Sequence, residues 1–275
     1  MKDFENIKKN KLLIGAKTDP GIAYDHNEDN YLIDKEINLF LIADGMGGHL
    51  AGELASKIAI NSTHKNVIRL IKEEKMTPDT MLKEAIYYAH KAIRNKASED
   101  ISYNNMGSTI VAAYLTSKLN TLWVAHVGDS RAYNFHNGEL KLLTEDHTLF
   151  NQVRLANLLP EDPSKWPPKN ILSQALGASH VIVPDVNEFN INKNDSIMLC
   201  SDGVTNILDN KTLSEYLSSL AHPQIICDEI IDAANTKGAK DNITVIIIKL
   251  YKGDINTSIK YKNLLRTKEL KQSWK

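Results

Sequence analysis

Short apolar runs, separated by polar or glycine-containing segments, recur along the chain and have the length of buried β-strands. They lie at residues 12–16, 39–43, 109–115, 122–127, 197–200 and 243–250. Residues with high β-propensity are frequent in them. Six such runs predict at least one large sheet, and their number favours two.

Two long segments between the second and the third run carry apolar residues at helical spacing. In the first segment, which follows residue 49, the apolar positions are Leu54, Ile58, Val67 and Ile71. The second helix is expected to begin at Thr77, with Pro78 at its first position. Its apolar stripe consists of Leu82, Ile86, Ala89 and Ile93.

Two shorter helices are predicted nearer the C-terminal end. Thr212 and Glu215 have the spacing of a capping box, which would begin the first of them. The second is expected to end near Gly238, and its apolar stripe consists of Ile226, Ile230 and Ala233. Helices that are grouped apart from runs of strands favour antiparallel sheets flanked by helix pairs, an α+β fold.

The segment 148–184 differs from the rest because prolines interrupt it, at positions 160, 163, 167 and 168. We interpret it as an irregular flap within one domain that spans residues 11–251. A basic extension follows at residues 252–275. A solvated segment is the default interpretation of such a charge run, and an amphipathic helix that docks on a partner or an anionic membrane is the alternative.

Composition excludes several classes of protein. The 275 residues carry a formal net charge of −1, so the chain lacks the basic field of a nucleic-acid binder. Cys200 and Cys227 are the only two cysteines, too few for a disulfide framework or a cysteine-rich zinc site. No apolar stretch reaches the length of a transmembrane segment. These features predict a cytoplasmic protein with no transmembrane segment.

Aspartates recur at the ends of the apolar runs. Asp44 and Asp202 follow two runs and each precedes a glycine, Asp129 follows a run and a glycine, and Asp241 directly precedes the last run. Any single Asp-Gly pair is most simply a turn. Carboxylates that converge from four strand ends would instead repel one another unless cations bound between them. Oxygen ligands alone indicate Mg²⁺ or Mn²⁺ rather than zinc.

A series of short motifs in a fixed order spans nearly the whole chain. The motifs are Asp19-Pro20-Gly21 with Asn27-Glu28-Asp29; Asp44-Gly45-Met46-Gly47-Gly48-His49 with Ala51-Gly52-Glu53; Gly107-Ser108-Thr109; Gly128-Asp129-Ser130-Arg131; Leu143-Thr144-Glu145-Asp146-His147; residues 173–177; Ser201-Asp202-Gly203; and Asp241-Asn242-Ile243-Thr244-Val245. This series resembles the metal-dependent protein phosphatase (PPM) family, the type 2C Ser/Thr phosphatases, in their bacterial form.

The resemblance implies a four-layer α/β/β/α sandwich of two antiparallel sheets, with a cleft at one end that holds two Mg²⁺ or Mn²⁺ ions and a weaker third ion. It further implies hydrolysis of phosphoserine or phosphothreonine in protein substrates by a water that two metal ions activate, in a monomer that opposes a Ser/Thr kinase. The metal ligands that it implies are Glu28, Asp29, Asp44 (bridging), the Gly45 carbonyl, Asp129 (third site), Asp202 and Asp241. Asn242 would orient Asp241, and Arg131 would support the loop of Asp129.

Two positions bear on catalysis beyond the metal ligands. The family has an arginine that grips the substrate phosphate three residues before Asn27, and Tyr24 occupies that position here. A tyrosine cannot form a bidentate cationic clamp, so the site binds phosphate more weakly or through another anchor, such as Lys17 or His26. Met46 stands where eukaryotic relatives have a histidine, so His49 or a metal-bound water is left as the general acid that acts beside Asp44 and Asp29.

Two functions stay open at this point. The first is the active phosphatase, with the flap helping to select its substrates. The alternative is a phosphatase-like binding module with weak or no turnover, for which Tyr24 would be the signature. The full set of candidate metal ligands favours the enzyme.

Overall fold

The computed structural model describes residues 10–48, 50–73 and 76–252. His49 lies outside the described residues, and so does the basic extension apart from Lys252, the last residue of its strand. Among the helices that are described, none combines the length and the hydrophobicity needed to cross a membrane.

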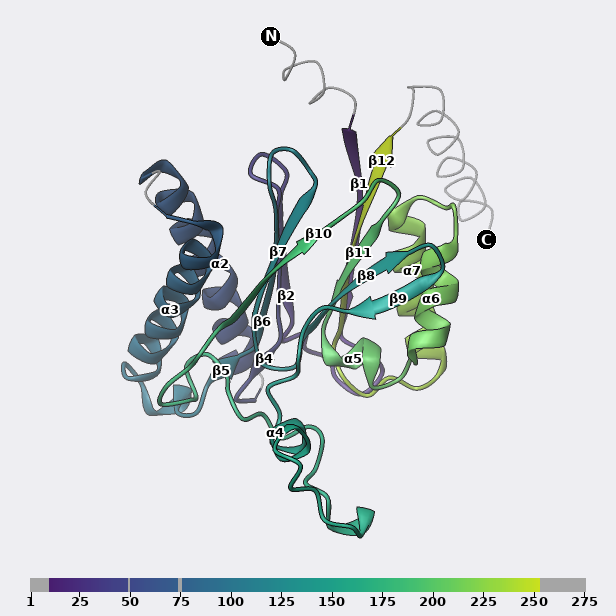
Figure 1. Cartoon of the computed structure of the whole chain (residues 1–275). Coiled ribbons are helices and arrows are strands. Elements are labelled where there is room, and N and C mark those ends of the chain that lie inside the picture. The colour runs from purple at the N-terminus through teal and green to yellow at the C-terminus, as the bar shows by residue number, and fades with distance from the viewer. Residues whose placement is uncertain (1–9, 49, 74–75, 253–275) are drawn as a thin grey trace.

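Two five-stranded antiparallel sheets form the centre of the molecule (Figure 1). In spatial order, the first sheet contains β1 (Asn10–Asp19), β12 (Ile243–Lys252), β11 (Ser196–Cys200), β8 (Arg131–His136) and β9 (Glu139–Leu142). The second contains β10 (Asp185–Asn190), β7 (Thr121–Val127), β6 (Ile110–Leu115), β3 (Leu39–Ala43) and β2 (Asn30–Asp34). A two-stranded ribbon, β4 (Gly45–Met46) with β5 (Gly107–Ser108), lies at one end.

Helices cover the outer face of each sheet, which confirms the predicted four layers. The helices α2 (Leu50–Glu73) and α3 (Pro78–Ala97) pack on the sheet that contains β3, and α6 (Asn210–Ser218) and α7 (Pro223–Thr236) pack on the sheet that contains β12 (Figure 1). Short α5 (Asp202–Thr205) follows β11. A 3₁₀ turn spans Ile101–Tyr103 after α3.

The central strands are buried on both faces because each sheet lies between helices and the other sheet. In β3, Leu39 and Leu41 belong to the core beneath α2 and α3, whereas Phe40 and Ile42 belong to the core between the sheets. Side chains of a strand alternate between its faces, so a strand with two apolar environments becomes a continuous apolar run. This accounts for the predicted strands at 39–43, 109–115, 122–127, 197–200 and 243–250, whereas β1 lies at a sheet edge and its apolar residues Leu12, Ile14 and Ala16 pack against the core between the sheets.

The sequence prediction missed β2, β8, β9 and β10, because these strands carry polar side chains among their apolar ones. Strands β2, β9 and β10 lie at sheet edges, and β10 is partly exposed at every position. The β8–β9 hairpin turns at Asn137 and Gly138, which have φ values of 49° and 88°. That dipeptide is a hairpin signal in its own right.

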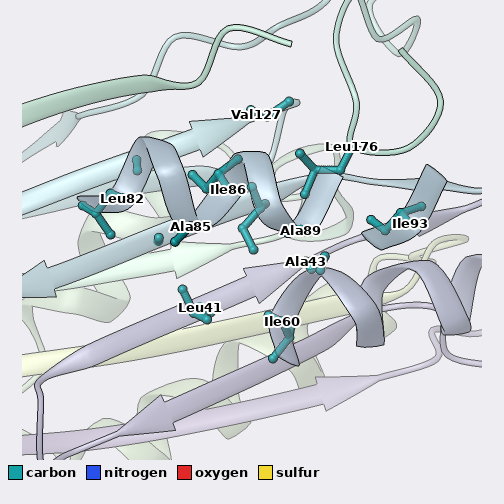
Figure 2. Packing of buried hydrophobic residues seen from close by; sticks show 14 of the residues in the cluster. Leu41, Ala43, Ile60, Leu82, Ala85, Ile86, Ala89, Ile93, Val127 and Leu176 are labelled. Atoms are coloured by element: carbon teal, nitrogen blue, oxygen red, sulfur yellow. The ribbon is translucent and has the colours of Figure 1, made fainter. Parts of the chain in front are cut away.

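The predicted stripe of α3 is confirmed, and that of α2 is confirmed in part, because Ile58 and Ile71 pack against the core that contains Val67 but stay partly exposed. Leu82, Ile86, Ala89 and Ile93 are all fully buried (Figure 2). Of the four apolar positions predicted for α2, Val67 alone is buried, and the buried face is formed mainly by Ala51, Ala55, Ala59 and Ile60. Small side chains let a helix approach its neighbours closely, so they mark the inner face better here than the larger residues do.

The two C-terminal helices are present as predicted, except that the first begins earlier than expected. Helix α6 begins three residues before the expected capping box, because Asp209 is its N-cap and accepts a hydrogen bond of 2.8 Å from the Thr212 backbone N–H. Helix α7 ends at Thr236, followed by Gly238 with a φ of 85°, as predicted. Residues 148–184 contain α4 (Leu149–Leu155) and a 3₁₀ turn at Pro163–Lys165, and the part that carries these two elements projects away from the sandwich (Figure 1). Leu176 and Ile182, in the returning part, belong to the core beneath α2 and α3.

Gly15 of β1 sets how closely α7 packs on its sheet. A Cβ atom at this position would lie 2.2 Å from the Gln224 backbone N and 2.3 Å from the Pro223 carbonyl carbon. The Gln224 side chain then bonds the neighbouring backbone, because its Nε2 donates to the Ala16 O (2.9 Å) and its Oε1 accepts from the Ala16 N (3.2 Å). The first turn of α7 is therefore fixed to the backbone of β1.

We expect Gly15→Ala to lower the free energy of unfolding by about 1–3 kcal/mol, because the backbone of α7 must move away from β1. Urea denaturation measures the change. Lys17→Ala is the matched control, since Lys17 lies on the same face of β1 and forms an exposed ion pair of 3.3 Å with Asp232 of α7. Such pairs contribute about 0–1 kcal/mol. Equal stability of Gly15→Ala and wild type would contradict the close packing.

Candidate metal centre

Five aspartates reach one end of the sandwich from five segments. Asp44 follows β3, Asp129 follows β7, Asp202 follows β11, Asp241 precedes β12 and Asp29 precedes β2. The four that follow or precede the long apolar strands are those that the sequence placed at strand ends. Strands held in two packed sheets are rigid mounts for side chains, so their termini bring the carboxylates together.

The proximity of these carboxylates is evident from their electrostatics. Burial, followed by the negative charges of Asp29 and Asp202, raises the pKa of Asp44 well above its ordinary value. Burial raises the pKa of Asp29 to about 7, with Asp202 and Asp241 adding to the effect. Burial and the charges of Asp202 and Asp146 raise the pKa of Asp129 to about 7. Like charges at short range disfavour ionisation, so without a counter-charge the cluster retains protons.

The arrangement fits divalent cations. Asp29 Oδ1 and Asp202 Oδ1 are buried and have no hydrogen-bond partner within the described part of the chain. A buried carboxylate oxygen without a partner is costly, and hard cations such as Mg²⁺ and Mn²⁺ bind such oxygens. The donor set is carboxylates together with a backbone carbonyl, so the residues present fit these two ions.

A directed chain of hydrogen bonds holds Asp29. Asn27 Nδ2 donates to Thr18 Oγ1 (2.8 Å), and Thr18 shares a bond of 2.7 Å with Thr244 Oγ1. Thr244 Oγ1 donates to Asp29 Oδ2 (2.6 Å), and Ser201 Oγ donates to the same oxygen (2.7 Å). A hydroxyl has one proton, so Thr18 must donate to Thr244. One oxygen of Asp29 is thereby saturated, and the other is left for a cation.

The backbone of Asp44 is fixed on both sides by Ser108, the last residue of β5, and by Thr109, which precedes β6. Thr109 Oγ1 accepts from the Asp44 N (2.9 Å), while the Thr109 N (2.8 Å) and Ser108 Oγ (3.0 Å) donate to the Asp44 O. Ser130 Oγ lies 2.7 Å from Thr109 Oγ1. The segments of Asp44 and Asp129 are therefore joined through Thr109 and Ser130, and these residues were not assigned a role from the sequence.

Gly45 and Gly52 leave room for the Glu28 side chain. A Cβ atom on Gly52 would collide with Glu28 Oε2 at 1.6 Å, and one on Gly45 would lie 2.1 Å from the Gly52 O. The Gly45 N donates to the Glu28 O (3.2 Å). Gly52 of the motif Ala51-Gly52-Glu53 has no side chain, and this leaves room for the Glu28 carboxylate next to the Gly45 backbone.

Asn242 ties the loop before β2 to the start of β12. Its Nδ2 donates to the carbonyls of Pro20 (2.9 Å) and His26 (3.0 Å), and its Oδ1 accepts from the Glu28 N (2.7 Å). Its own backbone N–H donates to Asp241 Oδ1 (2.9 Å). Every polar group of the Asn242 side chain is used in this way to hold Glu28 and the loop in place.

Arg131 forms a bidentate ion pair with Asp146 beside Asp129. Arg131 Nε donates to Asp146 Oδ1 (2.8 Å), and one terminal nitrogen donates to Oδ2 (2.6 Å). The other terminal nitrogen donates to the Tyr133 hydroxyl (3.2 Å). The hydrogen bonds to Asp146 raise the pKa of Arg131. The guanidinium is thus engaged with neighbouring protein groups and fixes the strand that follows Asp129.

A pocket of about 520 Å³ separates the carboxylates from residues of the flap. The flap contributes Asn170, Leu172, Ala175 and Ala178 among others, and the opposite wall includes Asp44, Asp129, Asp202 and Asp241. No basic side chain is found among the described residues that line it. The described lining of this pocket therefore supplies no positive charge to an anionic ligand, whereas bound cations would.

Residues 24–241 match the family described as Protein phosphatase 2C. The serine/threonine phosphatase Stp of Listeria monocytogenes is 35% identical to this chain over 240 residues, which are 85% of this chain and 94% of that protein. The chain belongs to the protein phosphatase 2C family.

Two solved structures confirm the fold of this 2C-type chain. The serine/threonine phosphatase PstP of Mycobacterium tuberculosis has a TM-score of 0.76 at 28% identity, covering 87% of this chain and 99% of that one. A PstP catalytic domain in complex with two manganese ions has a TM-score of 0.74 at 26% identity, covering 88% and 99%. The two-sheet sandwich expected from the resemblance is confirmed.

Tyr24 and the two residues considered as replacements for the missing arginine lie away from the pocket lining, whereas Met46 is part of it. Tyr24 is half exposed, in the loop between β1 and β2, and does not line the pocket. Lys17 cannot replace the missing arginine, because its Nζ contacts Asp232 (3.3 Å) and Asp228 (3.8 Å) on α7. His26 is exposed in the same loop as Tyr24, and its carbonyl is bound by Asn242.

We expect the chain in EDTA to become less stable as the pH rises from 6 to 8. The folded chain keeps protons on Asp29 and Asp129 up to a pKa of about 7, whereas the unfolded chain loses them near the ordinary value of 3.8. The stabilisation is full below pH 4 and is lost as the pH rises through 7. The melting temperature should fall by several degrees, at about 2–4 °C per kcal/mol, and Mn²⁺ should restore it at pH 8.

Asp29→Asn isolates the effect of one carboxylate. Burial lowers the pKa of His126, which gives a slope of the opposite sign, so the comparison between wild type and Asp29→Asn is the decisive one. The variant should show a smaller decrease between pH 6 and 8 in EDTA. An identical pH dependence of both proteins would show that Asp29 is not protonated in the metal-free chain.

Proposed function

We propose that this chain hydrolyses phosphoserine and phosphothreonine in proteins, with Mg²⁺ or Mn²⁺ held by Glu28, Asp29, Asp44, Gly45, Asp202 and Asp241, and a weaker third ion at Asp129. The convergence of five carboxylates, with one oxygen each of Asp29 and Asp202 buried and unpartnered, carries the proposal. Metal-dependent protein phosphatase activity agrees with the family, with the names of its relatives and with the two manganese ions bound to the PstP domain.

Two bound ions lower the pKa of a water between them and offset the charge that develops on a phosphoryl group during in-line displacement. The residues of the chain provide the frame for this chemistry. The Asp44 carboxylate is close enough to Asp29, Asp202, Asp129 and Asp241 for their charges to raise its pKa, so it lies at the centre of the cluster, where it would hold both ions. Asn242 and Arg131 hold the segments of Glu28 and Asp129 and do not need to contact substrate.

The flap gives the site a surface for protein substrates. A second hollow of about 680 Å³ adjoins the first and shares Asp129, Asp202 and Asn170 with it. Two cationic residues of the flap line it, Arg154, which is paired with Glu145 at 2.7 Å, and Lys169, whose Nζ lies 5.3 Å from the Phe150 ring centroid. Residues 148–184 are therefore suited to contact the peptide that flanks the phosphorylated residue, within a catalytic domain at 11–251 that precedes the basic extension at 252–275.

The binding-module alternative has no specific support. The hydroxyl chain that saturates one oxygen of Asp29 leaves the other for a cation, and the glycines beside Glu28 preserve room for its carboxylate. These are features of a functioning metal centre. Tyr24 is absent from the described lining of the pocket, so we propose that it alters how phosphate is bound and does not alter the metal ligands.

We further propose that the protein acts in the cytoplasm, as a monomer that opposes a Ser/Thr kinase. Both cysteines are unpaired and buried, and burial raises the pKa of Cys200 to about 12, so its thiol stays protonated. Unpaired thiols suit a reducing compartment. Size-exclusion chromatography with light scattering tests the monomer, and a phosphoproteome comparison between cells with wild type and Asp202→Ala identifies substrates and kinase.

Hydrolysis of p-nitrophenyl phosphate should require Mn²⁺ or Mg²⁺ and should disappear in EDTA. Asp44→Asn should lower kcat/KM by at least about 100-fold, because residues that only support metal ligands already cost 10- to 100-fold. Asp232→Asn is the matched control, since that carboxylate is exposed on α7. Metal-independent turnover, or full activity of Asp44→Asn, would overturn the proposed function.

Tyr24→Arg should raise kcat/KM on a phosphothreonine peptide by about tenfold or more, chiefly through KM, because hydrogen bonds to charged groups contribute about 1.5–3 kcal/mol. Tyr24→Phe removes only the hydroxyl and should match wild type, while Tyr24→Lys supplies charge without the bidentate geometry and should fall between them. Steady-state kinetics of the four proteins decides the matter. If Tyr24→Arg gains nothing, the phosphate is anchored by the cations alone.

A further inference from the structure

A compact polar cluster lies at the base of the flap, outside the carboxylate pocket. His147 immediately precedes the flap and Asp185 immediately follows it, while His126 belongs to β7, where it pairs with Asp185 of β10. The two imidazole rings stack with centroids 4.6 Å apart. One nitrogen of each ring and a carboxylate oxygen lie within 4.8 Å of one another. This spacing would suit a metal site as well as a hydrogen-bonded cluster. The two cases differ in which ring nitrogens carry a proton.

The hydrogen bonds of His147 fix its tautomer. The Gly128 backbone N–H donates to Nδ1 (3.3 Å), which must therefore be unprotonated. A neutral ring then carries its proton on Nε2, which donates to Asp185 Oδ2 (3.2 Å). A metal bound at Nε2 would place the proton on Nδ1, opposite the Gly128 N–H, so that two donors would face each other. The contacts of His147 therefore favour a hydrogen-bonded clamp over a metal site.

His126 completes the clamp from the sheet. Its Nε2 donates to the Glu145 carbonyl (2.8 Å), and burial lowers its pKa, so the ring is neutral. Other charged groups near the cluster are Asp146, which is paired with Arg131, and Glu145, which is paired with Arg154. The clamp thus rests on a strand of the sheet, and its polar groups do not need an ion.

His147 contacts the loop of Asp129 and both ends of the flap at once. Its backbone N–H donates to the Gly128 O (2.9 Å), which together with the bond to Nδ1 forms a reciprocal pair with the residue before Asp129. Its carbonyl accepts from the Ser173 N (2.8 Å) in the returning half of the flap, and its Nε2 reaches Asp185 where the flap ends. His147 thus joins these three segments through its backbone and both ring nitrogens.

We propose that His147 is a positioning residue that couples the placement of the flap to the orientation of the Gly128–Asp129 loop at the metal centre. The inference deepens the proposed phosphatase function and rests on it. The two ring nitrogens have separate tasks, because Nδ1 orients the metal-site loop and Nε2 holds the flap. Substrate capture by the flap and turnover at the metal centre are thereby linked through one side chain.

Two substitutions separate the tasks. The side-chain oxygen of asparagine lies as many bonds from Cα as histidine Nδ1, and the amide nitrogen of glutamine lies as many as Nε2. His147→Asn therefore keeps an acceptor for Gly128 and loses Asp185, whereas His147→Gln keeps a donor for Asp185 and loses the acceptor. Asp185→Ala removes the flap contact from the other side, on a carboxylate whose side chain is 46% exposed, so its loss leaves no large buried cavity.

His147→Asn and Asp185→Ala should raise KM for a phosphoprotein about fivefold and leave kcat and p-nitrophenyl phosphate hydrolysis within twofold of wild type. Trypsin should cleave the flap, which contains Arg154, Lys165 and Lys169, about fivefold faster in both. His147→Gln should lower kcat about tenfold on both substrates and leave flap cleavage unchanged. His64→Gln is the matched control, because His64 forms a similar pair with Asp34 (2.8 Å) between α2 and β2.

The coupling is overturned if His147→Asn and His147→Gln change KM and kcat in the same proportion, or if neither His147→Asn nor Asp185→Ala exposes the flap to trypsin. It is also overturned if wild type binds one more equivalent of Zn²⁺ than His126→Ala, because the cluster would then be a metal site. A wild-type chain without metal-dependent turnover would instead refute the proposed function, and the trypsin comparison would still report on the clamp.

Discussion

Carboxylates repel one another at one end of the sandwich, and the packing of the two sheets holds them there. Five aspartates converge there, and burial and neighbouring charges raise the pKa of Asp44, Asp29 and Asp129. A flexible chain would relieve that repulsion by moving apart. Here strands buried on both faces fix the positions of Asp44 and Asp202, so the repulsion can be relieved only by protons or by cations. The packing of the two sheets is thus what preserves affinity for metal.

The polar groups around the aspartates do not neutralise their negative charge. Hydroxyls of Thr244 and Ser201 hold Asp29, which positions the carboxylate but leaves its charge available. The nearby cation, Arg131, is occupied by a bidentate pair with Asp146. A lysine in place of Thr244 would pair with Asp29 and compete with the metal. The donors close to the carboxylates are therefore neutral, and the arginine is paired with Asp146. Bound cations would then be the main source of positive charge.

The sequence predicted the structure best where a residue type occurs in one kind of environment. Apolar runs such as 39–43 and 197–200 marked strands that are buried on both faces, and aspartates at their ends marked the metal centre. Edge strands such as Asp185–Asn190 were missed because their side chains meet solvent as well as the core. The roles of Thr109, Ser201 and Thr244 were missed for another reason. A hydroxyl gains its function from a partner distant in sequence, as Thr244 does from Asp29, and no local pattern records that partner.

Tyr24 changes the energetics of substrate binding in a way that follows from the same constraint. In a site with an arginine clamp, phosphate gains part of its affinity from a charge that is always present. The described lining of this pocket offers carboxylates and flap residues without a basic side chain, so an anionic phosphate would be repelled unless the ions are bound. Binding of substrate and binding of metal must then strengthen each other by the same factor, because such coupling is reciprocal. We therefore expect the phosphate affinity of this chain to depend on metal concentration more steeply than that of a site with an arginine clamp.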